Sequence, residues 1–390
     1  MIVLILSILL YLLFACSMYV MGLCSSSKSS NSYLQFNPSG ERMDKYIWYS
    51  IIFYTIIVSI RYRVGADCES YADSLLDFAK GNYHEGRGHE LEPIAILFGN
   101  IVNFFGGSRV LLLGLYGFCE VFFIEYALRS RKALLPFVGA LIILGPFWFD
   151  LNNGLRQVTV TCMLLYAIQQ LVDYCRWKKF LLLVFLGYFM HKSALILMPL
   201  VLLVFYDKLP NRWIMIGSLL LCIGLGSSGV VNQFISQGES YIKMFGYAEY
   251  SDRMDYFIEQ ESLVSNYGPR RIVMFLSYVL FMWFSSHVDD FVGHDKFFRV
   301  CLLLAFAYVC LSELLVSSFF IFSRPLGYVH IFVLISIAYT LYYLKCKTQS
   351  LIFLAGLILC CSYVLIECLA VYSNPNEYSL YKFIFLKELY

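Results

Sequence analysis

The residues best suited to chemistry gather in a short polar strip from Arg61 to Tyr71, which reads RYRVGADCESY. Two arginines and two acids fall within nine residues of it: Arg61, Arg63, Asp67 and Glu69. Guanidinium groups bind phosphate oxygens in a planar fork, and a neighbouring carboxylate can accept a proton or hold a hydroxyl group. The structural alternative is anchoring at an interface, with arginines extended toward water and acids capping the next helix.

Four further polar motifs interrupt apolar stretches and offer the same kinds of group. They are Glu92-Pro93, Arg156 within NGLRQ (153–157), His191-Lys192-Ser193, and Arg324-Pro325. Arg156 begins an apolar helix, where the positive helix end and the guanidinium both favour an anion. His191 suits a proton acceptor or a donor to phosphate. Structural alternatives stay open, with Glu92 as a helix cap and His191 as a packing group; either arginine can also simply extend toward the interface.

Composition decides what kind of fold must position these groups. The chain has 390 residues, of which 60% are hydrophobic and 14% charged, and its mean hydropathy is +0.69. Water could not cover so much apolar surface, which excludes a soluble domain. The net charge of +2 gives no reason to expect nucleic acid as a partner. The thirteen cysteines form no C-x-x-C pair and are expected to be buried hydrophobic residues.

Apolar stretches recur along the whole chain, and most approach the roughly 20 residues needed to cross hydrocarbon. They lie near 1–22, 46–60, 108–128, 134–149, 155–172, 180–206, 213–230, 272–286, 298–322, 325–344 and 350–372. Continuous runs of this kind satisfy their backbone only as helices. The sequence therefore predicts an all-α polytopic membrane protein of about eleven to thirteen helices, forming one integral-membrane domain over 1–390, with the first stretch retained as a permanent helix.

The charge pattern predicts which loops share a side. Short basic loops stay cytoplasmic, and three qualify: Arg129, Arg131 and Lys132; Arg176, Lys178 and Lys179; Lys345 and Lys347. The acidic loops 61–92 and 231–270 suit the outer face. The stretch 180–206 is too long for one span, so we expect a hairpin of two short or broken helices with His191 at its outer tip. The short stretch 93–105 is expected to be interfacial or re-entrant, and broken segments of this kind indicate a site.

Taken in order, these motifs resemble the EpsG family of Wzy-type polysaccharide polymerases over nearly the entire chain. The resemblance rests on RYRVGADCESY, Glu92-Pro93, NGLRQ, HKSALILMPL (191–200) and SRPLGY (323–328), with Cys68 in place of the family's usual aromatic residue. It implies a multi-pass glycosyltransferase of the bacterial inner membrane, related to the GT-C enzymes. Such an enzyme joins repeat units carried on undecaprenyl pyrophosphate into O-antigen, capsule or exopolysaccharide at the periplasmic face. Its partners would be the lipid-linked oligosaccharide, membrane lipid and a chain-length regulator protein.

The expected chemistry needs cations for the leaving pyrophosphate and one proton acceptor for the attacking sugar hydroxyl. For the pyrophosphate we expect Arg63, Arg156 and Arg324, with Arg61 and Lys192 beside them. The expected base is Asp67 or His191, and Glu69 or Glu92 would position sugar hydroxyls. No D-x-D motif lies on an outer loop, so we expect neither a metal nor another cofactor.

Two other functions use similar residues. A flippase or other transporter of lipid-linked sugar would also bind pyrophosphate, but its charges should line both halves of the membrane path. Here the expected site gathers on the outer half, which favours chemistry at that face. An O-antigen ligase would differ only in its acceptor, which these residues do not reveal.

Overall fold

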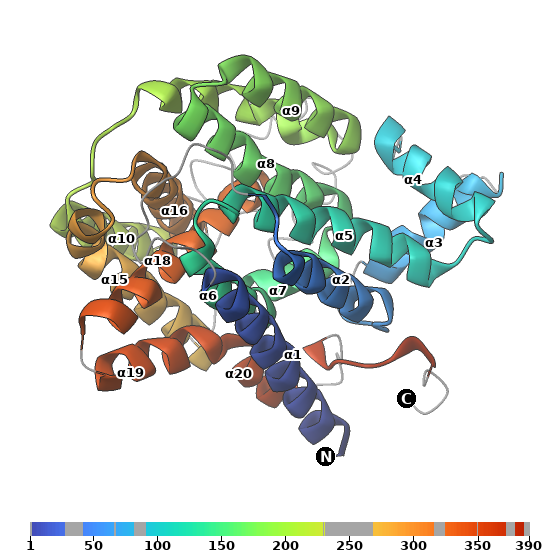
Figure 1. Cartoon of the computed structure of the whole chain (residues 1–390), viewed down its shortest axis with the longest axis horizontal. Helices are drawn as coiled ribbons and strands as arrows, with labels where there is room; N and C mark the ends of the chain where they lie inside the picture. The colour runs from blue at the N-terminus through green and yellow to red at the C-terminus, as the bar shows by residue number, and fades with distance from the viewer. Residues whose placement is uncertain are drawn as a thin grey trace.

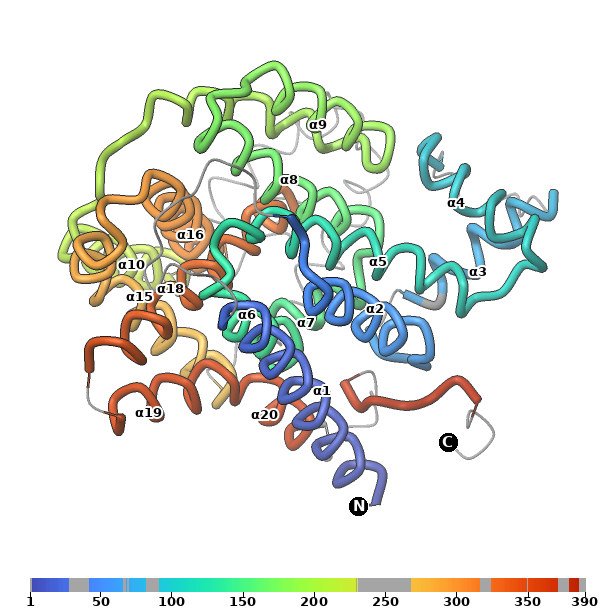
Figure 2. Tube along the Cα trace, in the orientation of Figure 1, coloured from blue at the N-terminus to red at the C-terminus, as the bar shows by residue number. Residues whose placement is uncertain are grey.

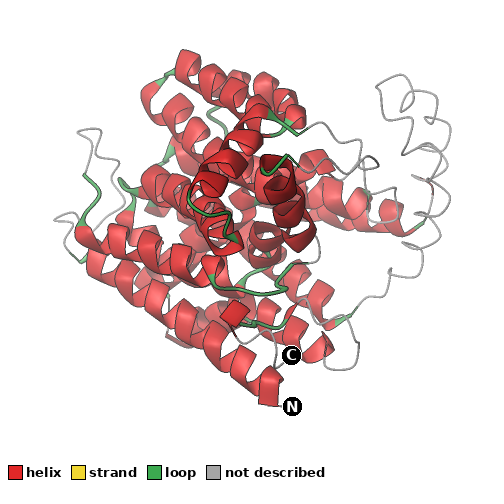
Figure 3. Cartoon of the chain, turned by 90° about the vertical axis from the view of Figure 1, so that its right-hand side faces the viewer, coloured by secondary structure: helices red, strands yellow, loops and turns green. Residues whose placement is uncertain are grey.

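The structure, a computed structural model, describes residues 2–27, 42–65, 68–81, 91–228, 230, 268–315, 324–348, 350–371 and 379–385. These segments are helical, with one isolated β-bridge and no strand among them (Figure 3). The first half forms α1 (Ile2–Ser26), α2 (Lys45–Ser59), α3 (Cys68–Ala79), α4 (Pro93–Phe104), α5 (Arg109–Leu128), η1 (Lys132–Leu134), α6 (Leu135–Leu144), α7 (Phe147–Asn153) and α8 (Leu155–Tyr174). The second half forms α9 (Trp177–Met190), the 3₁₀ helix η2 (Lys192–Phe205), α10 (Arg212–Ser227), α15 (Pro269–Phe291), α16 (Lys296–Leu314), η3 (Arg324–Val329), α18 (Ile331–Lys347), α19 (Ser350–Cys361) and α20 (Tyr363–Val371).

The all-α, polytopic membrane class predicted from the sequence is confirmed. Among the described residues, five helices are long and apolar enough to cross a membrane, or seven if each of two bent pairs is one span. This is fewer than the eleven to thirteen expected, because several apolar stretches form helices of only 10–17 residues, α2, α4, η2 and α10 among them. All thirteen cysteines are free thiols.

Helix α8 lies at the centre of the described fold. It packs against α5 and α9 along its sides and also contacts η2, η3, α7, α16 and α18. Around it, α1 lies along α6, and α2 lies along α5 (Figure 1). Helices α3 and α4 pack on each other at the far edge of the molecule (Figure 2). The beginning of α8 is therefore surrounded by segments distant in sequence, which makes it a natural place for a site.

Local sequence explains where several helices begin and bend. The Asp44 carboxylate caps α2 by accepting from the backbone N–H of Tyr46 and Ile47 at 2.9 and 3.2 Å, the usual role of an N-cap acid. Between α6 and α7, Gly145 and Pro146 break the helix, and the two halves meet at 65°. Proline cannot donate the backbone hydrogen bond that a continuous helix needs. The bend leads into α7, which ends at Asn153, just before α8 begins at Leu155.

The stretch 180–206 forms the predicted hairpin. Helix α9 ends at Met190, His191 is extended, and η2 returns as a 3₁₀ helix of 14 residues with Pro199 inside it. Lys296, at the start of α16, donates to the backbone oxygen of Val204, which places the end of η2 beside the start of α16. A 3₁₀ helix rises about 2.0 Å per residue, so 14 residues extend about 28 Å, close to the thickness of hydrocarbon. The prediction of two short helices meeting at His191 is confirmed.

A buried cluster of ionised side chains lies at the end of the bundle that is opposite to the beginning of α8. Arg131 donates to both carboxylate oxygens of Asp173 at 2.7 and 2.8 Å and to Asp295 at 2.9 and 3.0 Å. Burial raises the pKa of Asp295, but the Arg131 guanidinium outweighs it and holds the pKa below its usual value. Asp173 and Arg156 lie 17 residues apart on α8, or about 26 Å at the α-helical rise. The two ends of the bundle thus carry separate charged layers.

Removing the arginine of this cluster should destabilise the fold strongly. In Arg131→Met, Asp173 and Asp295 keep their burial and lose their counter-charge, so we expect the free energy of unfolding to fall by about 3–5 kcal/mol. The matched control is Arg109→Met, which breaks the solvent-accessible pair with Asp73 and should cost about 1 kcal/mol or less. Unfolding by denaturant titration in detergent measures both. Equal losses for the two variants would contradict the structural role given to Arg131.

Candidate functional site

A cavity of about 440 Å³ lies at the beginning of α8. Its wall draws on α3, α7, α8, α16 and η3, and on the break between α9 and η2. The side chains in this wall that can carry charge or donate a hydroxyl are Tyr71, Asp150, Arg156, His191, Tyr308, Ser312 and Arg324. Three of the residues proposed from sequence, Arg156, His191 and Arg324, therefore share one cavity.

Arg156 is held in place by a buried ion pair. Its guanidinium donates to the Glu92 carboxylate and lies 5.3 Å above the ring of Tyr71. The second Glu92 oxygen accepts from the backbone N–H of Lys192 at 3.3 Å. Glu92 is the N-cap residue of α4, but its side chain makes no capping hydrogen bond. The helix-cap alternative for Glu92 is therefore wrong, and Glu92 orients Arg156 and ties the start of α4 to the hairpin tip.

His191 belongs to a compact group of three hydrogen-bonding side chains. Its Nδ1 lies 2.6 Å from the Tyr328 hydroxyl and 2.8 Å from the Ser193 hydroxyl, and the two hydroxyls are 2.8 Å apart. Burial lowers the pKa of His191 to about 4; Glu92 raises it, while Arg156 and Arg324 lower it further. The imidazole is therefore neutral at pH 7. In the tautomer in which Nδ1 accepts from a hydroxyl, the proton resides on Nε2, where it can be donated.

Arg324 reaches the cavity from η3, and α8 fixes that segment. Gln157 donates from its amide to the backbone oxygen of Arg324 at 2.6 Å, and the Thr161 hydroxyl lies 3.4 Å from the oxygen of Gly327. Gly327 lies so close to the Gln157 amide that an added Cβ would stand 2.9 Å from its nitrogen. The NGLRQ motif thus supplies one arginine directly and positions the backbone of the second.

A pair that the sequence did not single out also contributes to the wall. Asp150 on α7 accepts from His330 Nδ1, and the His330 ring stacks on Tyr308 with centroids 4.5 Å apart. Phe147 packs edge-on against the same ring. His330 is buried, with 5% of its side chain exposed, whereas 44% of the Asp150 side chain is accessible. The carboxylate therefore faces open space while the imidazole lies behind it.

Arg61 lies away from the cavity wall, although it was proposed to bind pyrophosphate. It is 1% exposed, and its guanidinium donates to the backbone oxygens of Val58 and Asn152 and to Cys68 Sγ. The neighbouring Gly65 has φ +90°, and a Cβ there would stand 2.3 Å from the Asn152 oxygen. Arg61 and Gly65 therefore join the polar strip to α7, which supports Asp150 from behind.

The other proposed residues have different surroundings. Arg63 is exposed with φ +52°, and its guanidinium lies 5.4 Å from the centre of the Tyr62 ring. The Lys192 side chain is exposed and is not part of the cavity wall. Asp67 and the side chain of Glu69 lie outside the described residues, so the roles proposed for them remain predictions.

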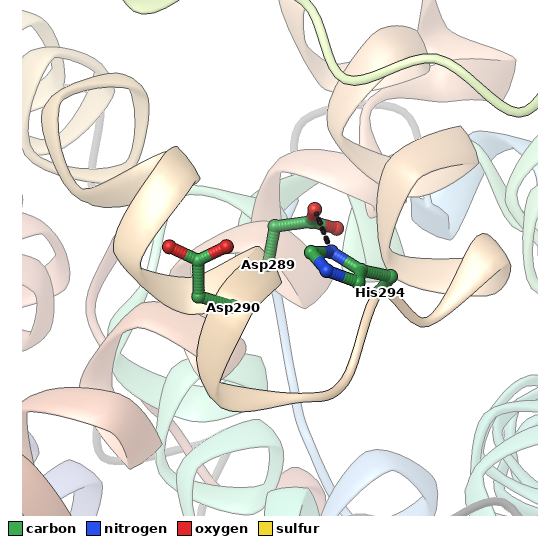
Figure 4. A group of neighbouring side chains, drawn as sticks. All are labelled: Asp289, Asp290 and His294. Atoms are coloured by element: carbon green, nitrogen blue, oxygen red, sulfur yellow. Dashed lines mark hydrogen bonds and ion pairs between the residues drawn. The ribbon is translucent and has the colours of Figure 1, made fainter.

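A group of possible metal ligands lies at the other end of the bundle, where α15 ends. Figure 4 shows Asp289 and His294 facing each other, with Asp290 turned aside. His294 Nδ1 and Asp289 are 2.8 Å apart, and both Asp289 oxygens also accept from Arg299 at 2.9 Å. An ion would have to displace this two-point contact, so the group is an arginine-bound acid in the described fold.

The low pKa of His191 predicts a pH-dependent stability. An unfolded histidine takes up its proton near pH 6.5, whereas the folded one does so near pH 4. The stability is therefore complete above pH 6.5 and is lost as the pH falls toward 4, by about 2–3 kcal/mol between pH 7.5 and 4.5.

The matched control for this pH dependence is His191→Asn, which keeps an acceptor for Tyr328 but does not titrate. Denaturant unfolding in detergent measures the free energy of unfolding at pH 7.5 and 4.5. Its decrease between the two pH values should be smaller in the variant than in the wild type by about 2–3 kcal/mol. Parallel losses would show that His191 does not titrate in this way.

Comparisons with known proteins complete the description of the site. The model of the EpsG family matches residues 45–384, which include every element that contributes to the cavity wall. No curated protein and no solved structure matches the chain, and the expected likeness to GT-C enzymes stays a prediction. The family match covers most of the chain and agrees with the resemblance that its polar motifs indicate. The chain belongs to the EpsG family.

Proposed function

We propose that the chain is a glycosyltransferase of the polysaccharide-polymerase type. It joins oligosaccharide repeat units carried on undecaprenyl pyrophosphate, and it does so at the outer face of the bacterial inner membrane. The product is an O-antigen, a capsule or an exopolysaccharide, and the partners are the lipid-linked oligosaccharide, membrane lipid and a chain-length regulator protein. The observation that carries the proposal is the cavity at the beginning of α8, where Arg156 and Arg324 lie beside a neutral histidine.

The leaving group explains the need for two arginines. A sugar hydroxyl of one lipid-linked unit attacks the anomeric carbon of the other, and the bond from that carbon to undecaprenyl pyrophosphate breaks. Negative charge grows on the pyrophosphate as it leaves, and arginine forks stabilise it best when they are already oriented. The Glu92 ion pair and the Tyr71 ring orient Arg156 before the substrate arrives. In the tautomer with the proton on Nε2, His191 is a third donor that adds no charge of its own.

The distribution of charge supports an enzyme over a transporter. Arg156, His191 and Arg324 lie at one end of α8. At its other end Arg131 is enclosed by Asp173 and Asp295, and Arg176 donates to Gln170. A carrier of pyrophosphate needs accessible cations along its whole path. We therefore favour chemistry at one face of the membrane.

Replacing Arg156 should abolish polymer formation without blocking export. In a deletion strain carrying Arg156→Ala, we expect polymerisation to fall at least about 100-fold, as for the loss of one preorganised donor to a developing anion. Finished lipid should then carry single repeat units on a glycan gel. Arg156→Lys keeps the charge but loses the planar fork of donors. Its activity should therefore lie between those of the wild type and Arg156→Ala.

The matched control for Arg156→Ala is Arg109→Ala, which removes an arginine outside the cavity wall and should leave the polymer ladder unchanged. Accumulation of lipid-linked units on the cytoplasmic side in Arg156→Ala would indicate a transporter and would overturn the proposal. A full polymer ladder in that variant would do the same.

A further inference from the structure

The reaction needs a proton acceptor, and the cavity wall contains two candidates within the described residues, His191 and Asp150. His191 Nδ1 already lies within hydrogen-bond distance of two hydroxyls, Tyr328 and Ser193. Where these hydroxyls donate to Nδ1, the proton resides on Nε2, and in that tautomer His191 is placed to donate. In that tautomer Asp150 is the acceptor for the sugar proton among the described residues of the wall.

Asp150 has the geometry that His191 lacks. One carboxylate oxygen, Oδ2, accepts from His330 Nδ1, and within the described residues no hydrogen bond reaches Oδ1. The side chain is 44% accessible and forms part of the cavity wall. Asp150 also lies just before the turn that leads to Arg156, because α7 ends at Asn153 and α8 begins at Leu155. A carboxylate oxygen and the anion-binding arginine thus face the same space.

The surroundings of His330 suit it to hold the Asp150 carboxylate in place. Its ring is stacked on Tyr308 and lies edge-on to Phe147, and the residue is buried. In the Ser-His-Asp triad a buried acid orients the histidine that reacts. Here the imidazole of His330 is the buried partner and the carboxylate of Asp150 is accessible. A ring fixed on both sides holds the Asp150 carboxylate in one orientation through the hydrogen bond from Nδ1.

We propose that Asp150 is the catalytic base of the transfer and that His330 is the residue that positions it. The inference rests on the proposed polymerase function. Asp150 Oδ1 takes the proton from the attacking sugar hydroxyl while that oxygen forms its bond to the anomeric carbon. The bond to pyrophosphate breaks with both electrons leaving on the pyrophosphate oxygen, which Arg156 and Arg324 receive. The carboxylate also offsets the positive charge that develops on the sugar ring.

The decisive experiment uses the purified full chain in lipid nanodiscs, with lipid-linked repeat units from its own host as substrate. In Asp150→Asn, kcat should fall at least about 100-fold, the usual contribution of a general base, and KM should stay within twofold. Formate should restore the rate of Asp150→Ala at least about tenfold, because a small carboxylate can occupy the vacated space. The matched acid control, Asp73→Asn, lies outside the cavity wall and should keep the wild-type rate.

Two variants of His330 test its positioning role. His330→Phe keeps the aromatic packing and loses the donor, so kcat should fall about tenfold with KM unchanged. His330→Asn places an amide nitrogen where Nδ1 was and should recover the wild-type rate to within about threefold. Equal rates for the two variants would overturn the positioning role.

The outcomes separate this inference from the proposed function. A wild-type protein that makes no polymer from its own repeat units contradicts the polymerase proposal itself. A wild type that polymerises, together with an Asp150→Asn variant that keeps more than a third of its rate, overturns the base assignment alone. If Asp150→Asn does not fold, Asp150→Glu is the test, because it displaces the carboxylate by one methylene. A wild-type rate for Asp150→Glu at unchanged melting temperature would also overturn the base assignment.

Discussion

A charge that leaves water must find a partner, and hydrocarbon supplies none. This constraint decides where ionised side chains lie in the described fold. Arg131 is enclosed by two aspartates at one end of α8, and Arg156 is paired with Glu92 at the other end. Between them α8 is built mostly from apolar residues and threonines. The bundle therefore carries its chemistry at helix ends and its packing in the middle.

The same constraint explains why much of the site could be predicted. A polar residue that interrupts an apolar stretch marks a helix end, and short basic loops indicate which ends share a side. This reasoning placed Arg156, His191 and Arg324 together, although they come from three separate segments. It also recovered the hairpin at His191, because a stretch of 27 residues is too long for one crossing and its only strong interruption lies in the middle.

What the sequence could not give is which polar groups face each other. Glu92 and Arg156 are 64 residues apart, and Asp150 and His330 are 180 apart, and nothing in local spacing pairs them. Arg61 shows the converse, since its charge-rich neighbourhood suggested a ligand site. Its two terminal nitrogens instead donate to Val58, Asn152 and Cys68. The described residues contain fewer membrane-length helices than expected for a related reason: hydropathy measures how apolar a stretch is, while prolines and packing decide how much of it forms one helix.

The 3₁₀ form of η2 gives the hairpin a mechanical property. A 14-residue segment would shorten by about 7 Å on converting to an α-helix, because the rise per residue drops from about 2.0 to 1.5 Å. Pro199 opposes that conversion, since in an α-helix its ring would clash with the backbone carbonyl four residues earlier. The backbone between Lys192 and Phe205 thus acts as a spacer of fixed length, and that length sets the distance of the His191 imidazole from the far end of η2.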